Sequence, residues 1–206
     1  GSLIRLTWVL LLALCLPSIR SAIAREADAA ERQLRSEVAG KGWLLFAARS
    51  EGADYDLFLC RPDGSGKRNV TQTREWIEFG GRLSPDRQRM LYRRLPAGSA
   101  INHDTWGATG TLVIAKADGS NPQPLGKDGD FPWASWSPDG KQLACLYKRE
   151  GKIRIFDQAT RQVVREMPRK GIFQQLYWSG DGKRLCGTAN LNGQDWNIIA
   201  LEVESG

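Results

Sequence analysis

Histidine and the motifs of common catalytic sites are almost absent from this chain of 206 residues. The single histidine is His103, and no GxSxG segment is present to carry a nucleophilic serine. One histidine without a CxxC pair cannot supply the usual ligands of a zinc site. The GSGK segment at 64–67 lies between two predicted strands and opens no helix, so it does not form a phosphate-binding loop. We therefore predict a protein that is not an enzyme, with no catalytic residue, no metal site and no cofactor.

Long runs of one charge are also missing. The chain has 29 Lys and Arg against 23 Asp and Glu, a formal net charge of +6, and no run of five basic residues. The acids and bases alternate among turns and strand faces, which is typical of an ordinary solvated surface. This pattern gives no support to nucleic-acid binding or to binding at anionic lipid, and we predict no nucleic-acid partner.

No apolar run is long enough to cross a membrane. The longest, Leu6–Leu16, has 11 residues, whereas a spanning helix needs about 20. Arg5 precedes this run, and Ala22-Ile23-Ala24 supplies a small-x-small cleavage pattern, so residues 1–24 are predicted to be a secretory signal peptide. The alternatives are an uncleaved anchor and a lipoprotein signal ending at Cys15, which is disfavoured because Leu14 stands where a small residue is needed. We expect a periplasmic or secreted protein with no stable membrane span in the mature chain.

Residues 25–42 are predicted to form a helical lead segment. Positions 25–39 are rich in Ala, Glu and Arg and contain no Gly or Pro, while Gly40 and Gly42 follow directly. The apolar stripe is thin, so this helix is expected to pack weakly.

Three cysteines, Cys60, Cys145 and Cys186, remain after the predicted cleavage site. Each lies in an apolar, strand-like run, where a thiol behaves as a small hydrophobic side chain. Buried free cysteines are therefore expected, although one disulfide among the three is compatible with the spacing.

A short turn motif recurs along the remainder of the chain. It reads LSPDRQ at 83–88, WSPDGK at 136–141 and WSGDGK at 178–183. With Gly40 as the first, the matching turn positions Gly40, Arg87, Gly140 and Gly182 are 47, 53 and 42 residues apart. A unit of about 40 residues is typical of one four-stranded propeller blade, and the longest interval contains an insertion at Leu95–Gly110.

Each repeat predicts the same order of strands. A first strand ends at the turn motif, and a second begins at Arg89–Tyr92, Gln142–Tyr147 or Arg184–Thr188. Third strands are predicted at Asp56–Cys60, Thr111–Lys116, Lys152–Phe156 and Trp196–Leu201, each followed by a polar turn and, in all but the last unit, an outer strand. Trp136 and Trp178 stand at the same place in two units, so we expect them to pack between blades rather than to form an exposed binding platform.

These segments resemble the TolB-like propeller repeat, which combines an aromatic-Ser-Pro-Asp-Gly-Lys turn with a later Asp-Gly-Ser and Leu-Thr. The matching stretches are WSPDGKQLACLY at 136–147, YDLFLCRPDGSGKRNVT at 55–71 and LVIAKADGSNPQPL at 112–125. The resemblance covers 43–206 and implies an all-β fold of four-stranded blades. Arg87 replaces the turn glycine in one unit and Gly180 replaces the proline in another.

The predicted number of blades is about four, whereas the resemblance implies six. The first unit has no convincing inner strand, and the fourth reaches Glu204 where the turn to an outer strand would begin. Unpaired strand edges are unfavourable in an open propeller. We favour a partial propeller, with an unusual closure as the alternative.

The insertion carries the candidate partner-binding loop, Asn102, His103, Asp104 and Trp106, and it is the one segment that breaks the period. A solvated loop with its tryptophan packed on the blade edge is the structural alternative.

The resemblance implies an exported, non-enzymatic propeller module that mediates protein–protein interaction in the periplasm or cell envelope, with envelope or periplasmic proteins as partners. The alternative is a propeller accessory to a hydrolase or lyase whose catalytic part lies outside this chain. A structural domain within a larger sensor or transport component is a third interpretation.

Overall fold

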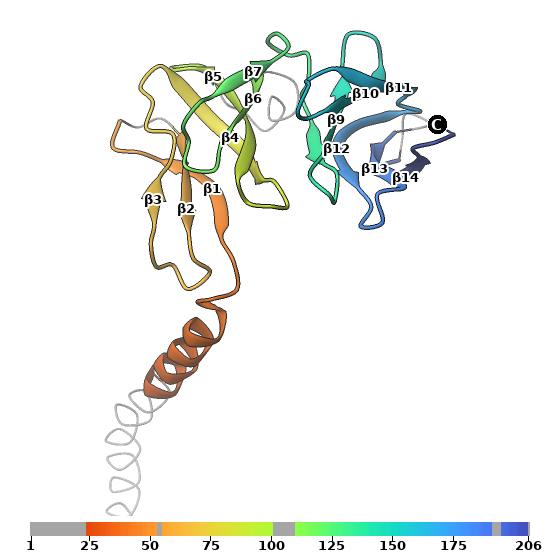
Figure 1. Ribbon diagram of the computed structural model, residues 1–206. Coiled ribbons are helices and arrows are strands. Elements are labelled where there is room, and N and C mark those ends of the chain that lie inside the picture. Colours follow the sequence, from red (N-terminus) through yellow and green to blue (C-terminus); the bar gives the residue numbers. More distant parts are fainter. Residues whose placement is uncertain (1–23, 53–54, 101–109, 191–194, 206) are drawn as a thin grey trace, which may run out of the picture. The chain divides into compact units, whose positions relative to one another are not determined.

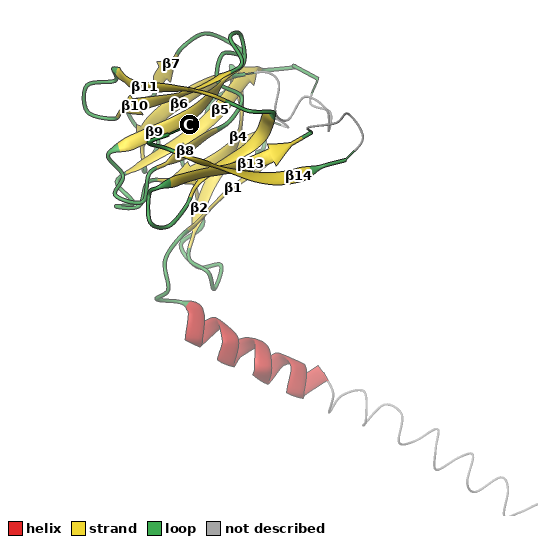
Figure 2. Ribbon diagram, turned by 90° about the vertical axis from the view of Figure 1, so that its right-hand side faces the viewer, coloured by secondary structure: helices red, strands yellow, loops and turns green. Residues whose placement is uncertain are grey.

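The computed structural model describes residues 24–52, 55–100, 110–190 and 195–205. Within these residues the protein is built from one helix and four antiparallel sheets (Figures 1 and 2). The chain divides into two compact units. One holds residues 45–59 and 68–206, and the other holds the chain up to residue 44 together with residues 60–67.

The first and second sheets differ by one strand. The first has three strands in the order β1 (Leu44–Arg49), β2 (Tyr55–Cys60) and β3 (Arg68–Asn69). The second has four, β4 (Trp76–Leu83), β5 (Arg89–Pro96), β6 (Thr111–Lys116) and β7 (Gln123–Leu125).

The third and fourth sheets repeat this arrangement. The third consists of β8 (Ala134–Trp136), β9 (Gln142–Tyr147), β10 (Lys152–Asp157) and β11 (Val163–Pro168). The fourth consists of β12 (Ile172–Trp178), β13 (Arg184–Ala189) and β14 (Asn197–Glu202).

This succession of sheets confirms the predicted order of strands and about four propeller units. The predicted second and third strands all form, with ends that differ by one residue at most, except that β5 runs to Pro96 rather than ending at Tyr92. The first sheet has three strands and no inner strand before β1, and the fourth has three strands in its described part. Both departures were predicted from the turn spacing.

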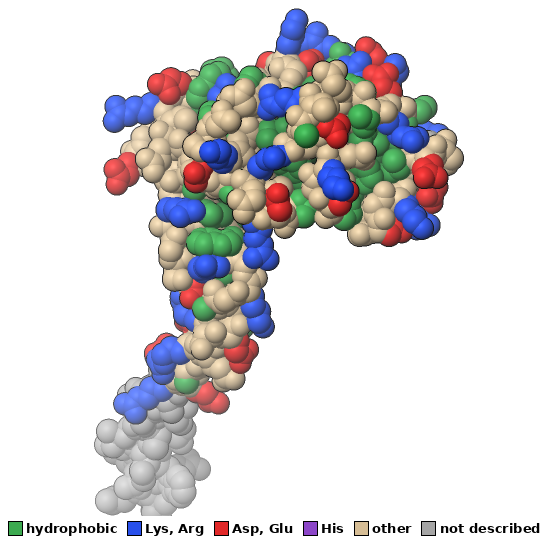
Figure 3. Space-filling view, viewed as in Figure 1, with side chains coloured by type: hydrophobic (Ala, Val, Ile, Leu, Met, Phe, Trp, Pro, Cys, Tyr) green, Lys and Arg blue, Asp and Glu red, His purple; other side chains and the backbone are tan. Residues whose placement is uncertain are grey.

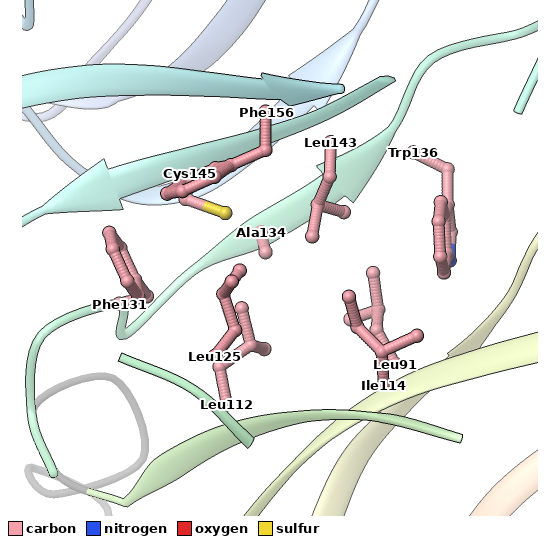
Figure 4. Close-up of a cluster of buried hydrophobic side chains, with 10 residues drawn as sticks. All are labelled: Leu91, Leu112, Ile114, Leu125, Phe131, Ala134, Trp136, Leu143, Cys145 and Phe156. Atoms are coloured by element: carbon pink, nitrogen blue, oxygen red, sulfur yellow. The ribbon is translucent and has the colours of Figure 1, made fainter. Parts of the chain in front are cut away.

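Adjacent sheets pack face to face through apolar side chains. Between the second and third sheets, Leu91, Leu112 and Ile114 meet Trp136, Leu143 and others in one buried cluster (Figure 4). Successive residues of β9 alternate between neighbours, because Leu143 and Cys145 face the second sheet while Ala144 and Leu146 join a cluster with the fourth. The central sheets are therefore buried on both faces, which explains their continuous apolar strands.

The recurring turns share one hydrogen-bond pattern. Ser137 donates its hydroxyl hydrogen to Asp139 at 2.6 Å, and the same carboxylate accepts the backbone N–H of Lys141 at 3.0 Å. The turns at 84–89 and 179–184 have the equivalent bonds. The residue after each aspartate has a positive φ: 61° at Arg87, 71° at Gly140 and 71° at Gly182.

Both repeat-equivalent tryptophans lie between sheets, as predicted. Trp178 donates its indole N–H to the Ser135 carbonyl at 3.1 Å, and Trp136 donates to the Arg82 carbonyl at 3.5 Å. Each indole therefore joins its own sheet to the first strand of the preceding one.

The smaller unit contains the predicted helix, which covers residues 24–38 in its described part. Arg35 pairs with Glu31 at 2.8 Å along the helix and also donates to the Asp63 carbonyl of the turn at 60–67. Arg61 donates to the Gly42 carbonyl at 3.2 Å and lies over the Trp43 ring at 3.9 Å. The predicted signal segment lies almost wholly outside the described residues.

All three described cysteines are free. Cys60 and Cys145 are buried, and Cys186 is half-buried. No helix among the residues that the structure describes is long and apolar enough to cross a membrane.

Candidate functional site

The first strands of three sheets meet at Arg82 of β4. Its guanidinium donates to the Ala134 carbonyl of β8 at 3.1 Å and to the Leu176 carbonyl of β12 at 3.3 Å. It also lies over the ring of Tyr177, 4.3 Å from the centroid. The Arg82 side chain thus binds residues that lie 52 and 94 positions after it in the sequence.

A bulge in β4 precedes this arginine. The pairing of β4 with β5 shifts register between Phe79 and Arg82, and Gly80 within the shift has a φ of 66°. A β-bulge redirects the side chains that follow it, and glycine takes a positive φ without strain. A Cβ at Gly81 would meet the Leu45 side chain at 2.9 Å, so this part of the strand needs glycine for close packing as well.

A second buried arginine, Arg93 of β5, lies beside the first. Its side chain is 5% exposed and lies over the rings of Phe79 and Trp133, at 4.6 and 5.3 Å. The Arg82 guanidinium lies 5.9 Å from the same Trp133 ring. Trp133 therefore contacts both cations through its aromatic face, a favourable arrangement for desolvated guanidinium groups.

Burial desolvates both guanidinium groups of this arginine pair. Burial and, after it, the neighbouring positive charge of Arg82 together lower the pKa of Arg93 to about 10. Burial also lowers the pKa of Arg82, an effect that Tyr177 opposes. Both groups stay protonated at neutral pH, since an arginine pKa is far above 7 even after such shifts. The site therefore carries two adjacent positive charges away from bulk water.

A cavity of about 120 Å³ opens beside these groups. It is lined by Gly80, Gly81, Arg82, Leu91, Arg93, Leu112, Pro132, Trp133 and Ala134. The indole N–H of Trp133 is buried and has no hydrogen-bond partner. A buried donor without an acceptor is unfavourable by about 1–3 kcal/mol, so a ligand that accepts this hydrogen bond gains that free energy.

Two guanidinium groups and an unpaired indole N–H form a set of donors that suits an anion. Guanidinium groups bind carboxylates through paired, charge-assisted hydrogen bonds, and the surrounding rings exclude water that would weaken them. The cavity has room for a small acidic group, such as the carboxylate of a peptide side chain or terminus. We call Arg82, Arg93, Trp133 and Tyr177 the arginine site.

The predicted partner-binding loop lies outside the described residues. Asn102, His103, Asp104 and Trp106 all belong to the segment 101–109, so their role stays a prediction. Across the parts of the chain that the structure describes, no group of three or more His, Cys, Asp or Glu side chains is placed to hold a metal ion.

The sequence prediction did not include the arginine site. Two signals were present, and the first is that β5 reads RMLYRRLP, in which Arg93 and Arg94 interrupt an apolar stretch. A charged residue in such a strand has to be paired, solvated or functional. The second signal, the Gly80-Gly81 pair before Arg82, marks a bulge.

The chain is similar to solved propellers at low sequence identity. Putative TolB from Agrobacterium tumefaciens matches with a TM-score of 0.55 and 17% identity over 80% of this chain and 58% of that chain. The fold is that of a TolB-like β-propeller. The TolB-like propeller also matches a chain of a nidogen/laminin complex, with a TM-score of 0.52 and 15% identity over 79% of this chain and 56% of that chain.

A third match to the TolB-like propeller is hydrazine synthase from Kuenenia stuttgartiensis, with a TM-score of 0.50 and 16% identity over 81% of this chain and 58% of that chain. Our chain thus spans less than two thirds of the length of each of the three. No protein-family model and no curated protein matches the sequence. At these identities the likeness establishes the fold alone, which is used by proteins of several kinds.

Proposed function

We propose that this TolB-like propeller is an exported, non-enzymatic module that binds a protein partner in the periplasm or cell envelope, and that the arginine site receives an acidic group of that partner. The observation that carries the proposal is the pair of adjacent, desolvated arginines, Arg82 and Arg93, which line one small cavity. Two like charges buried side by side favour an anion in that cavity, which makes it a binding-site candidate.

The remaining surface fits this function. Basic and acidic side chains are interspersed over the face seen in Figure 3, which favours no large polyanion. Tyr177 is 49% exposed beside Arg82, and tyrosine and arginine are enriched where protein partners bind. A partner carboxylate would contact the arginines while its neighbouring residues pack on the tyrosine.

The test compares partner capture by matched variants. Trp133→Phe removes the unpaired N–H and keeps an aromatic ring, whereas Arg87→Gln removes one exposed positive charge that does not line the cavity. In a pull-down from an envelope extract, we expect Trp133→Phe to retain less of a specific protein and Arg87→Gln to retain as much as the wild type. The captured protein should be displaced by a short Asp-rich peptide and not by its Asn-containing counterpart. Equal capture by both variants, or no specific capture by the folded wild type, would refute the proposal.

The alternative function, a propeller accessory to a hydrolase or lyase, predicts a different result. A catalytic domain would then be encoded in the same gene, and the arginine site would face its substrate. Sequencing the complete gene distinguishes the two: further blades alone support the binding module, and an adjoining catalytic domain supports the accessory role.

A further inference from the structure

A second buried polar site lies between the first two sheets, away from the arginine site. Asp56 of β2 is 2% exposed and Glu78 of β4 is fully buried. Ionised carboxylates are almost never buried to this degree unless a positive charge or several donors compensate them.

Each carboxylate has one oxygen bound and one oxygen free. Asn69 donates its amide hydrogen to Oδ2 of Asp56 at 2.6 Å, and Thr73 donates its hydroxyl hydrogen to Oε1 of Glu78 at 2.6 Å. Oδ1 of Asp56 and Oε2 of Glu78 are buried and have no hydrogen-bond partner. Two short hydrogen bonds thus fix the carboxylates while leaving one lone-pair-bearing oxygen of each unsatisfied.

The supporting side chains are themselves held in place. Oδ1 of Asn69 accepts the backbone N–H groups of Thr71 and Gln72 at 3.2 and 3.1 Å, so its amide cannot rotate to present oxygen to Asp56. The Thr71 hydroxyl accepts the Leu57 N–H at 3.0 Å, which ties the same segment to β2. The arrangement is pre-organised rather than adaptable.

The two carboxyl groups act on each other. Burial is the main cause that raises the pKa of Glu78 to about 7, and the negative charge of Asp56 acts in the same direction. The hydrogen bond from Thr73 opposes both effects. None of the groups with the largest effect on the pKa of Glu78 is a Lys or an Arg. Arg94 is the cross-strand neighbour of Glu78 but is not among these groups, so a proton or another cation would compensate the buried pair.

A polar cavity reaches one member of the pair, Asp56, and the threonine that binds the other. It has a volume of about 770 Å³, and its wall includes Asp56, Asn69 and Thr73 together with Ser50, Glu51, Gly52, Phe58, Gln72 and Arg74. A cavity of this size and polarity admits several water molecules, which can complete the coordination shell of an ion.

We propose that Asp56 and Glu78 bind a hard divalent cation, Ca²⁺ or Mg²⁺, through Oδ1 and Oε2, with water from the cavity as the remaining ligands. The donor set contains only oxygen, which selects these ions over Zn²⁺ and Cu²⁺. Mg²⁺ commonly binds one or two protein carboxylates and keeps several waters, and Ca²⁺ accepts the same ligands in looser geometry. Because β2 and β4 belong to different sheets, the ion would clamp the first sheet to the second.

The test measures binding of each metal alone to the full chain. The protein is treated with EDTA, exchanged into metal-free buffer at pH 8 and titrated with CaCl₂ or MgCl₂ by calorimetry. We expect saturable binding of one ion per chain and a melting temperature that rises with ion concentration, as any ligand of the native state requires. The Glu78→Gln variant should lose this response. Because it also removes the like-charge repulsion, it should be no less stable than the metal-free wild type, so a loss of binding does not reflect unfolding.

Glu202→Gln is the matched control, since Glu202 is an exposed carboxylate paired with Arg184 at 2.6 Å. It should bind the ion as the wild type does. Two results would overturn the proposal: no saturable binding of either ion up to about 10 mM, beyond the weakest dedicated calcium sites, or undiminished binding by Glu78→Gln. The first of these results would assign the pair to a shared proton. Neither result bears on the arginine site, which contains neither residue.

Discussion

Replacing Arg87 with glycine should stabilise the protein, because Arg87 occupies a turn position that glycine holds in the other two units. Its φ is 61°, against 71° at both Gly140 and Gly182. For a residue with a Cβ, this left-handed conformation costs about 1–2 kcal/mol. Glycine removes that strain but adds about 0.4–1 kcal/mol of conformational entropy to the unfolded chain. The net gain in unfolding free energy should be about 0.5–1 kcal/mol.

The predicted gain is measurable by thermal unfolding. For a chain of this length, 1 kcal/mol corresponds to a shift of about 2–4 °C in Tm, so Arg87→Gly should raise Tm by about 1–4 °C. Arg87→Ala separates the loss of charge from the change in backbone, and it should leave Tm nearly unchanged. Gln88→Gly is the positional control. Gln88 has no positive φ, so its replacement relieves no backbone strain and only increases the conformational entropy of the unfolded chain.

The reciprocal variant tests the same reasoning in the opposite direction. A Cβ at Gly140 would lie 3.5 Å from Cδ of Pro85, which is ordinary contact, so Gly140→Ala carries the backbone strain alone. It should lower the unfolding free energy by about 1 kcal/mol. If Arg87→Gly lowers Tm, or if Gly140→Ala leaves it unchanged, the turn conformation does not limit stability and the reasoning is wrong.

Three further predictions address packing, pH and thiol chemistry. Gly119→Ala should lower the unfolding free energy by about 3 kcal/mol or more in urea, because its Cβ would lie 1.5 Å from the Val70 carbonyl oxygen and one of the two backbones would have to move. Asp139→Asn should be less stable than the wild type above pH 4, and the difference should shrink in acid. The reason is that hydrogen bonds from the turn's serine hydroxyl and backbone amide hold the pKa of Asp139 below its ordinary 3.8, so its stabilisation is lost as pH falls through the folded-state pKa. Burial raises the pKa of the Cys145 thiol, so Ellman's reagent should react with native Cys186 before the two buried cysteines, Cys60 and Cys145, and Cys186→Ser, unlike Cys145→Ser, should remove a fast-reacting thiol.

The recurring turns and the strands next to them could be predicted because their causes are local. The serine, aspartate and glycine of each turn satisfy one another within six residues, and the apolar runs on either side specify strands directly. The burial of Trp136 followed from its repeated position, since equivalent residues in a stacked array have equivalent neighbours. Even the missing inner strand of the first sheet followed from the spacing.

Both polar sites escaped prediction because they depend on contacts between distant strands. Arg82 meets carbonyl groups 52 and 94 residues away, and no local pattern specifies those partners. Asp56 and Glu78 come from different sheets, and each separately reads as an ordinary polar residue on a strand. Only the assembled structure brings these like charges together.

The contacts between turn glycines and prolines affect how a repeat array can lengthen by gene duplication. The ring of Pro85 lies against Gly140, and the ring of Pro138 lies against Gly182 in the same way. The turn at 136–141 thus presents a proline ring to the turn that follows it and a glycine backbone to the turn that precedes it. If the gene segment for such a repeat were duplicated in tandem, the new repeat would already contain both the proline and the glycine of this contact. It could therefore pack against the original repeat before any further substitution occurred.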